Sequence, residues 1–307
     1  MTKVLVVMGG VSSEREISIL SGNGVVAALQ EAGMTVIPYP LTADITDFVA
    51  VLEREKPDVV FNALHGKYGE DGCIQGLLNM MKVPYTHSGV LASAVGMDKE
   101  MTRRVVRAVG IPVADGFIVE KDEFERGREL AMPYVVKPND DGSSFGVYIV
   151  RNEEDRKEAL SHWPEGRSML TESYIAGREL SVAVLNGKAM GIVELVPKTG
   201  YYDFHNKYTA GCTTHIVPPV LPEEVANTLK SYAEQAHQAL GCRGTTRSDF
   251  RLDDVTDPAH PKIVFLEINT NPGMTPLSLV PEIARICCGL SYQELVVRLV
   301  MEATCEK

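Results

Sequence analysis

The feature that most constrains the fold is an alternation of strand-like and helix-like segments in the first third of the chain. Val4–Met8 is rich in β-branched residues and ends at Gly9-Gly10, and apolar positions at helical spacing follow it. A second strand-like run, 58–64, leads through HGKYGEDG into the apolar segment CIQGLLNMM. Such alternation predicts a parallel sheet with helices on both faces, which binds ligands at the carboxyl ends of its strands. Those ends carry Gly9-Gly10 and His65-Gly66, so we expect a site there.

Two polar residues near these strand ends are candidates for ligand contacts. Ser13 and Glu16 fit a capping box at the start of the first helix, which leaves Glu14 for another role. A buried carboxylate is a natural partner for a substrate ammonium, although an acidic residue is also favourable at any helix N-terminus. His65 is either a site residue or a histidine whose hydrogen bonds are satisfied locally.

The stretch VFLEINTNPGMTPLS, residues 264–278, begins as a buried strand and then breaks its apolar pattern. Glu267 and Asn269 interrupt the pattern at spacing two, and residues at this spacing share one face of a strand. Oxygen ligands of this kind suit a hard cation such as Mg²⁺. The alternative is a polar strand end that caps the turn at Asn271-Pro272-Gly273.

A second charged strand, TTRSDFRLD, comes shortly before this stretch. Alternation places Arg247, Asp249 and Arg251 on one face. Asp249 precedes Glu267 by 18 residues, a separation that suits two strands of a hairpin. Together with Asn269 these carboxylates would form an all-oxygen magnesium cluster. The alternative is an Arg–Asp surface pair on an edge strand.

The loop NDDGSSFG lies between the strand-like runs YVVKP and VYIV. Its backbone N–H groups and the hydroxyls of Ser143 and Ser144 suit phosphate oxygens, and Lys137 can add a point charge. The loop is not a Walker A motif, because it has no G-K-[ST] and a strand follows it. By itself the loop favours a plain hairpin over a phosphate site. Residues 198–212 have no clear period, and their length predicts a lid.

Composition limits the classes of function. The formal charge of −11 argues against a nucleic-acid or anionic-membrane surface, but it allows a nucleotide held by a few lysines. The six cysteines form no C-x₂-C pair, so neither a zinc site nor a disulfide scaffold is expected. No apolar stretch approaches the ~18 residues of a spanning helix, and no signal peptide is evident. We expect a cytoplasmic protein of two or three domains.

Taken together, the ordered motifs resemble the D-alanine–D-alanine ligases of the ATP-grasp superfamily. The resemblance covers nearly the whole chain and rests on GGVSSEREIS, LHGKYGEDG, GMDK, VVKPNDDGSSFGV, ESYIAGREL, YYDFHNKY, RSDF and EINTNPGMTPLSLVP. It implies an α/β protein (α+β overall) with the ATP-grasp fold. The implied domains are an N-terminal parallel α/β substrate domain, a central ATP-grasp domain, and a C-terminal ATP-grasp catalytic domain with a lid loop. Their ranges are 1–97, 98–171 and 172–307, with the lid at 198–212.

The resemblance also implies how ATP is held. The phosphates should contact Lys99, Lys137 and the loop residues Ser143 and Ser144, and the γ-phosphate should also meet the lid residue Lys207. Adenine should lie against Glu172, Ser173, Tyr174 and Ile175. The ribose should bind Glu179. Asp249, Glu267 and Asn269 should hold two Mg²⁺ ions, with Mn²⁺ as an alternative.

For the amino acids, the resemblance implies that Glu14 takes the ammonium of the first D-alanine with His65 nearby. Ser278 and Leu279 should hold the second D-alanine. Glu14, Ser143 and Tyr208 should form a hydrogen-bonded trio between the reacting groups and the lid. Arg247 and the Gly273 N–H can stabilise a tetrahedral oxyanion.

The implied reaction has two steps and serves the synthesis of peptidoglycan precursors. The carboxylate of the first D-alanine attacks the γ-phosphate and gives an acyl phosphate, which the amine of the second D-alanine then attacks. The resemblance also implies a homodimer. Rival hypotheses are a D-alanine–D-lactate ligase, another ATP-grasp ligase or kinase, and a nucleotide-binding regulator without activity. Relatives that make the D-lactate ester carry phenylalanine at the position of Tyr208, so this tyrosine favours the dipeptide.

Overall fold

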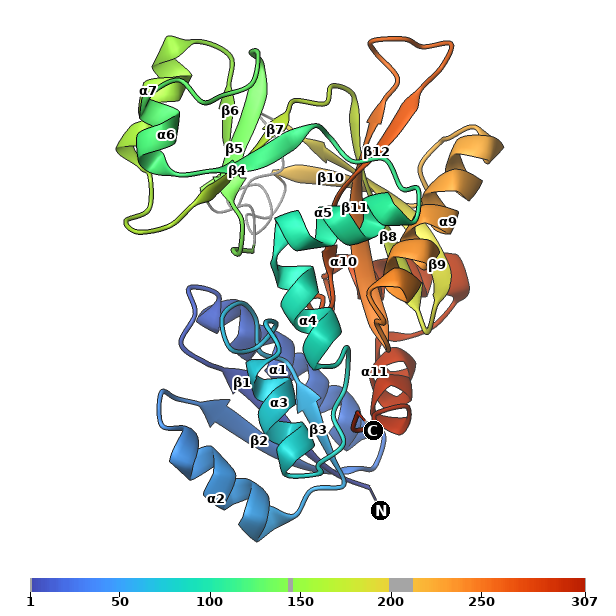
Figure 1. Ribbon diagram of the computed structural model, residues 1–307. Helices are drawn as coiled ribbons and strands as arrows, with labels where there is room; N and C mark the ends of the chain where they lie inside the picture. The colour runs from blue at the N-terminus through green and yellow to red at the C-terminus, as the bar shows by residue number, and fades with distance from the viewer. Residues whose placement is uncertain (1, 143–145, 199–211, 307) are drawn as a thin grey trace.

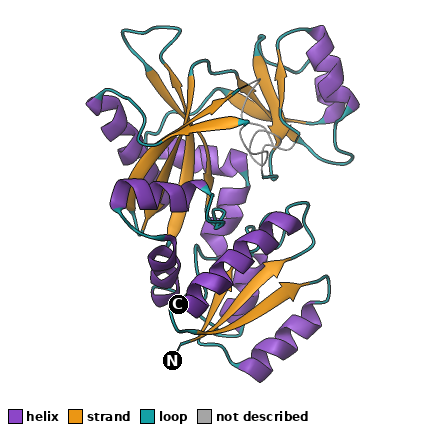
Figure 2. Ribbon diagram, turned by 180° about the vertical axis from the view of Figure 1, so that it is seen from behind, coloured by secondary structure: helices purple, strands orange, loops and turns teal. Residues whose placement is uncertain are grey.

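The computed structural model describes residues 2–142, 146–198 and 212–306. They form three separate sheets of three, four and five strands, each with helices packed on it (Figures 1 and 2). In the described part of the chain, no helix is long and apolar enough to cross a membrane.

The first sheet is parallel, as predicted, with the order β2-β1-β3. Its central strand is buried on both faces. Val4 and Val6 face a core that includes α1 and α11, whereas Leu5 and Val7 face α2 and α3. The elements are β1 (Lys3–Gly9), α1 (Arg15–Glu31), β2 (Thr35–Leu41), α2 (Ile45–Glu55), β3 (Val59–Asn62) and α3 (Cys73–Met80).

The start of α1 differs from the prediction. The helix begins at Arg15 with Glu14 as its N-cap residue, and no side chain caps it, so the Ser13–Glu16 capping box is wrong. Ser12 turns the chain instead: its hydroxyl accepts a hydrogen bond from the Glu14 N–H at 3.2 Å and donates one to the His65 carbonyl at 2.7 Å. The turn therefore holds Glu14 close to the start of the loop that follows β3.

Two helices, α4 (Val90–Met97) and α5 (Lys99–Ala108), lead out of the first sheet. The chain is extended at Asp98, whose side chain accepts a hydrogen bond from the Met101 N–H at 2.8 Å and so caps α5. This cap fixes Lys99 as the first residue of the helix.

The second sheet is antiparallel, with the order β4-β7-β5-β6. Helices α6 and α7 pack on it, and it has its own core around Phe124, Tyr134 and Trp163 (Figure 1). Strand β7 belongs to this sheet as far as Ser173, two residues beyond the predicted border at 171. The elements are β4 (Gly116–Val119), α6 (Lys121–Glu125), β5 (Tyr134–Pro138), β6 (Tyr148–Val150), α7 (Glu153–Ser161) and β7 (Met169–Ser173).

The third sheet has the order β10-β9-β8-β11-β12, and its pairs are antiparallel. Asn186-Gly187 forms the hairpin turn between β8 and β9, with positive φ angles of 48° and 76°. The predicted β11–β12 hairpin is confirmed: Asp249 lies opposite Glu267, and Arg247 lies opposite Asn269. The elements are β8 (Arg178–Leu185), β9 (Lys188–Pro197), β10 (Thr213–Ile216), α9 (Glu223–Ala239), β11 (Thr245–Asp253), β12 (Lys262–Asn269), α10 (Leu279–Cys288) and α11 (Tyr292–Met301).

The first and third sheets share one apolar core. Alternation along β8 sends Val182 and Val184 toward α9, while Ala183 and Leu185 face α10. The α10 side of this sheet continues without a break into the α1 side of the first sheet, where Val6 lies. This contact fixes the motifs predicted to bind amino acids, which lie on the two sheets, relative to each other.

Candidate active site

A cavity of about 460 Å³ lies between the four-stranded and five-stranded sheets. It collects residues from α5, β5, β7, β8, β11 and β12. Among them are nine of the residues predicted to bind ATP or metal: Lys99, Lys137, Glu172, Ser173, Tyr174, Ile175, Glu179, Asp249 and Glu267.

Glu172 is at the centre of a buried ion-pair group. Its carboxylate lies 2.5 Å from Lys137 Nζ and 2.9 Å from Arg103 Nε. All three residues are less than 10% exposed. Removal of one partner from a buried pair leaves an uncompensated charge, so the three groups depend on one another. The predicted adenine residue and a predicted phosphate lysine thus contact each other directly.

Lys99 joins two sides of the cavity. Its ammonium donates to the backbone carbonyl of Asp141 at 2.5 Å and lies 3.6 Å from Glu267 Oε2. The Lys99 N–H also donates to the Asn139 carbonyl at 2.9 Å. The start of α5 is therefore attached to the chain that enters the glycine–serine loop and to the predicted metal strand.

Arg251 organises the segment predicted to meet adenine and ribose. Its guanidinium donates to the carbonyls of Ile175, at 3.1 Å, and Gly177, at 2.7 Å. It also lies 3.3 Å from the Glu179 carboxylate. A bidentate cation of this kind holds the turn between β7 and β8 in one conformation.

The predicted metal ligands lie together at the end of the β11–β12 hairpin. Arg247 donates to both oxygens of Asp249, each at 2.9 Å, and Ser181 donates to one of them at 2.6 Å. Asn269 Oδ1 accepts from the Asn271 N–H at 3.0 Å. Within the described ranges, no group of three or more His, Cys, Asp or Glu residues is arranged to hold a metal. Two carboxylates and an amide oxygen nevertheless fit Mg²⁺, which commonly takes substrate phosphates as further ligands.

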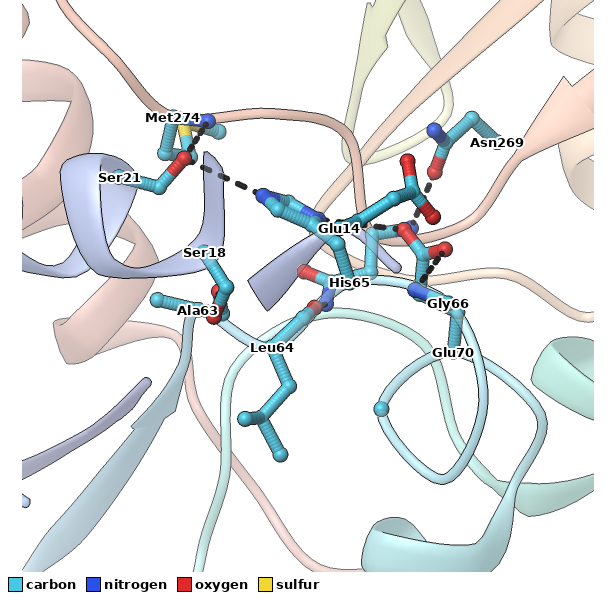
Figure 3. A network of polar contacts seen from close by, with 12 residues as sticks. Glu14, Ser18, Ser21, Ala63, Leu64, His65, Gly66, Glu70, Asn269 and Met274 are labelled. Carbon is cyan, nitrogen blue, oxygen red and sulfur yellow. Dashed lines mark hydrogen bonds and ion pairs between the residues drawn. The ribbon is translucent and has the colours of Figure 1, made fainter. Parts of the chain in front are cut away.

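The predicted amino-acid end is centred on His65, at the end of the first sheet (Figure 3). Its ring nitrogens lie 3.2 Å from Ser21 Oγ and 3.4 Å from Glu70 Oε1. Glu70 also accepts from the Gly66 N–H at 2.8 Å. Burial lowers the pKa of His65, but the hydrogen bond and charge of Glu70, with the charge of Glu14, outweigh it, so the pKa is raised.

Glu14 lies between two glycines. A methyl group added at Gly66 would be 2.9 Å from Glu14 Oε2, and one added at Gly142 would be 3.2 Å from the same oxygen. Gly142 is the last described residue before 143–145, so Glu14 adjoins the entrance to the glycine–serine loop. Asn271 completes the connection, because its amide donates to the Leu64 carbonyl at 2.8 Å and ties the end of β12 to the first sheet.

The residues predicted for the second D-alanine lie before and at the start of α10. Ser278 Oγ accepts from the Thr275 N–H at 3.0 Å, and it would lie 3.1 Å from a methyl group at Gly273. The Leu279 side chain is buried in the core shared by the first and third sheets. Any contact of Leu279 with a substrate would therefore come from its backbone, in the first turn of the helix.

Four predicted site residues lie outside the described residues, namely Ser143, Ser144, Lys207 and Tyr208. The two ends of the predicted lid are described. The Lys198 N–H donates to the Cys212 carbonyl at 2.9 Å, and β10 pairs with β9, so both ends of the segment start from adjacent strands.

Comparison with known proteins matches this arrangement to one family. The family described as D-ala D-ala ligase C-terminus matches residues 105–301, and that described as D-ala D-ala ligase N-terminus matches 46–88. A D-alanine–D-alanine ligase of Parvibaculum lavamentivorans is 46% identical over 307 residues, covering 99% of this chain and 98% of the relative. The D-alanine–D-alanine ligase of Gluconobacter oxydans is 47% identical over 304 residues, covering 98% of this chain and 99% of the relative.

The chain belongs to the D-alanine–D-alanine ligase family.

Solved structures agree with this membership of the D-alanine–D-alanine ligase family. The crystal structure of a ligase from Bacillus anthracis, complexed with ATP, has a TM-score of 0.80 and 31% sequence identity to this chain. The match spans 98% of this chain and 96% of the Bacillus anthracis chain. The ATP-grasp fold predicted from the sequence is therefore confirmed.

Within this ligase site, sequence reasoning missed several residues that hold the predicted ones in place. Arg103 and Glu70 are the main examples, and Ser21 and Asn271 also contribute. Arg103 had a weak signal, because it is a charged residue on the buried face of an amphipathic helix. Glu70 lies within LHGKYGEDG, but its contact with His65 depends on how the loop after β3 folds back.

Proposed function

We propose that this protein joins two molecules of D-alanine, with conversion of ATP to ADP and phosphate, to supply D-alanyl-D-alanine for peptidoglycan precursors. The observation that carries this proposal is the single cavity that collects Lys99, Lys137, Asp249 and Glu267. Phosphoryl transfer requires such positive charge and oxygen ligands, since catalysis depends on positioning and on neutralising the transferred phosphoryl.

ATP is proposed to lie in the cavity, with adenine near the 173–175 segment and phosphates toward Lys99. Lys137 would then exchange its contact with Glu172 for phosphate oxygens. Asp249, Glu267 and Asn269 are proposed to hold two Mg²⁺ ions, which neutralise developing charge on the phosphoryl group. Asp249 would have to share its oxygens between metal and Arg247.

Glu14 is proposed to bind the ammonium of the first D-alanine, with His65 and Glu70 as its support. The carboxylate of this D-alanine attacks the γ-phosphate of ATP, an acyl phosphate forms, and ADP leaves. The amine of the second D-alanine, held near Ser278 and the first turn of α10, attacks the acyl carbon and displaces phosphate. Arg247 and the Gly273 N–H are proposed to stabilise the oxyanion of that step.

The proposal also assigns roles to residues of the glycine–serine loop and of the predicted lid that lie outside the described residues. Ser143 and Ser144 are proposed to bind phosphates, Lys207 to reach the γ-phosphate, and Tyr208 to join Glu14 and Ser143. Closure over the site would keep water from the acyl phosphate.

The decisive experiment measures phosphate release from ATP and Mg²⁺ with D-alanine, with L-alanine and without an amino acid. We expect release only with D-alanine, and chromatography should identify the dipeptide. Release that does not depend on D-alanine would contradict the proposal and favour another ATP-grasp enzyme. No release, despite ATP binding, would favour a regulator without activity.

D-Lactate as the second substrate is the nearest alternative. We expect the dipeptide to dominate in mixtures of D-alanine and D-lactate, and we expect Tyr208→Phe to gain some ester formation. Chromatography of the products tests both points, and an unchanged product ratio would remove Tyr208 as the determinant.

We further propose a cytoplasmic homodimer of three-domain subunits. The proposed units are 1–97, 98–173 and 174–307, with the second border set at the end of β7. Sedimentation of the purified protein tests the dimer, and limited proteolysis tests the borders.

A further inference from the structure

Arg167 links two adjacent carboxylates at the entrance to the glycine–serine loop. Its guanidinium donates to Asp141 Oδ2 at 3.0 Å and also to Asp140 Oδ1. Arg167 lies in the loop between α7 and β7, and Asp140-Asp141 directly follow the strand that carries Lys137. One cation therefore neutralises two acids from a different part of the chain.

The position of Arg167 is fixed from the core side. Trp163, which is 7% exposed and packs in the core of the four-stranded sheet, donates its indole N–H to the Arg167 carbonyl at 2.9 Å. This bond holds the backbone at Arg167, and the planar guanidinium fork loses little side-chain freedom for each hydrogen bond that it forms. The side chains of Arg167, Asp140 and Asp141 are 37%, 60% and 34% exposed, so their pairing adds little to stability and acts mainly through the charge beside the cavity.

The two acids stand where negative charge is unfavourable for the proposed ligand. Asp141 lines the cavity, and its backbone carbonyl accepts the 2.5 Å hydrogen bond from Lys99. Unneutralised carboxylates on these two adjacent residues would repel the phosphates of ATP. The Arg167 guanidinium offsets that repulsion.

We propose that Arg167 is a positioning residue for ATP, which neutralises Asp140 and Asp141 and holds the Asp141 carbonyl on Lys99. The proposal rests on the proposed function for the identity of the ligand. On this proposal, a loop outside the cavity contributes to the affinity for the nucleotide although it does not contact the nucleotide.

The test is calorimetric binding of a non-hydrolysable ATP analogue with Mg²⁺, in the absence of D-alanine. Arg167→Ala should weaken binding about five- to tenfold at low salt, because two unscreened carboxylates then face the phosphates. The loss should shrink to about twofold near 0.5 M salt, where the Debye length is only a few Å. Arg167→Lys keeps the charge and should retain most of the affinity.

Rescue separates charge from structure. The triple variant Arg167→Ala, Asp140→Asn, Asp141→Asn should bind the analogue within about twofold of the wild type, because the repulsive charges are gone. Arg126→Ala is the matched control: it breaks an exposed pair with Asp122 on α6, on the same sheet, and should leave affinity unchanged. At saturating ATP, KM for D-alanine should be unaffected in Arg167→Ala.

Several results would overturn the inference: unchanged affinity in Arg167→Ala, a loss that does not depend on salt, or failure of the folded triple variant to recover. The analogue assay is independent of the ligase reaction. A wild type that binds the analogue but releases no phosphate with D-alanine would defeat the proposed function and leave the role of Arg167 intact. A wild type that binds no analogue would overturn both.

Discussion

The proposed nucleotide cavity and the His65 cluster are stabilised in different ways. In the cavity, charged side chains pair with one another across strands and helices, as Glu172 does with Lys137 and Arg103. Around His65, most contacts involve backbone groups or hydroxyls, as in Ser12 on the His65 carbonyl and Glu70 on the Gly66 N–H. On the proposed function, the cavity would exchange partners when ATP binds, whereas the contacts of the His65 cluster would stay as they are. Mutations should therefore act mainly through charge in the first region and mainly through shape in the second.

The largest effect is expected from Arg103→Ala. This change leaves Glu172 buried with Lys137 as its remaining cation, and loss of one partner of a buried pair costs about 3–5 kcal/mol. Chemical denaturation measures the change in the free energy of unfolding. Arg104→Ala is the control, because Arg104 pairs with Glu100 from the exposed side of the same helix and should cost under about 0.5 kcal/mol. Equal effects of the two changes would show that the buried group is not special.

Glu267→Gln tests the other side of the cavity. We expect D-alanine-dependent phosphate release to fall about 100-fold, because one proposed metal oxygen loses its charge. The free energy of unfolding should change little. Glu302→Gln, which removes an exposed ion pair with Arg298, serves as the control. An unchanged rate in Glu267→Gln would contradict the metal assignment.

Gly66→Ala tests shape at the His65 cluster. The added methyl group would meet Glu14 Oε2 at 2.9 Å, on a residue with φ of +69°. We expect KM for the first D-alanine to rise about tenfold, which corresponds to about 1.4 kcal/mol. Gly33→Ala separates strain from contact, since Gly33 also has a positive φ (+79°) but has no atom within 4 Å of the added methyl group. If both variants raise KM equally, the contact with Glu14 is not the cause.

The smallest effect concerns the pH dependence of stability. The folded-state pKa of His65 is raised, so its contribution is complete below the unfolded pKa of about 6.5 and is lost as pH rises through the folded pKa. Glu70→Gln removes the main cause of that rise. It should therefore destabilise the protein by about 1 kcal/mol more near pH 6 than near pH 9, as measured by denaturation.

His87 does not disturb this comparison of stabilities. Burial, with the charge of His65 as the second cause, lowers the pKa of His87 to about 3, so its protonation opposes folding in acid. At pH 6 and above His87 is neutral in the folded state, so its contribution is the same with and without Glu70→Gln. A Glu53→Gln variant, at an exposed position of α2, provides the control for a simple change of charge. A destabilisation by Glu70→Gln that is independent of pH would contradict a raised pKa for His65.

Local patterns in the sequence were sufficient for some parts of the site. Alternation placed Arg247, Asp249 and Arg251 on one face of β11, and the spacing to Glu267 predicted the hairpin that pairs them. These contacts depend only on strand periodicity and on a short connection, which a sequence displays directly. The ordered motifs also identified the ATP-grasp fold and the family.

The tertiary structure decided the rest. The capping box failed because Ser12, through its bond to His65, sets the turn before α1, and that bond joins residues 53 apart. Other contacts likewise join segments that are distant in the sequence. They are the Arg103–Glu172–Lys137 group, the Arg167 contact with Asp140 and Asp141, and the core shared by β1 and α10. A sequence determines which residues can be buried or charged along an element. Which of them meet depends on how the sheets pack, because burial then forces each charge to find whichever partner that packing brings near.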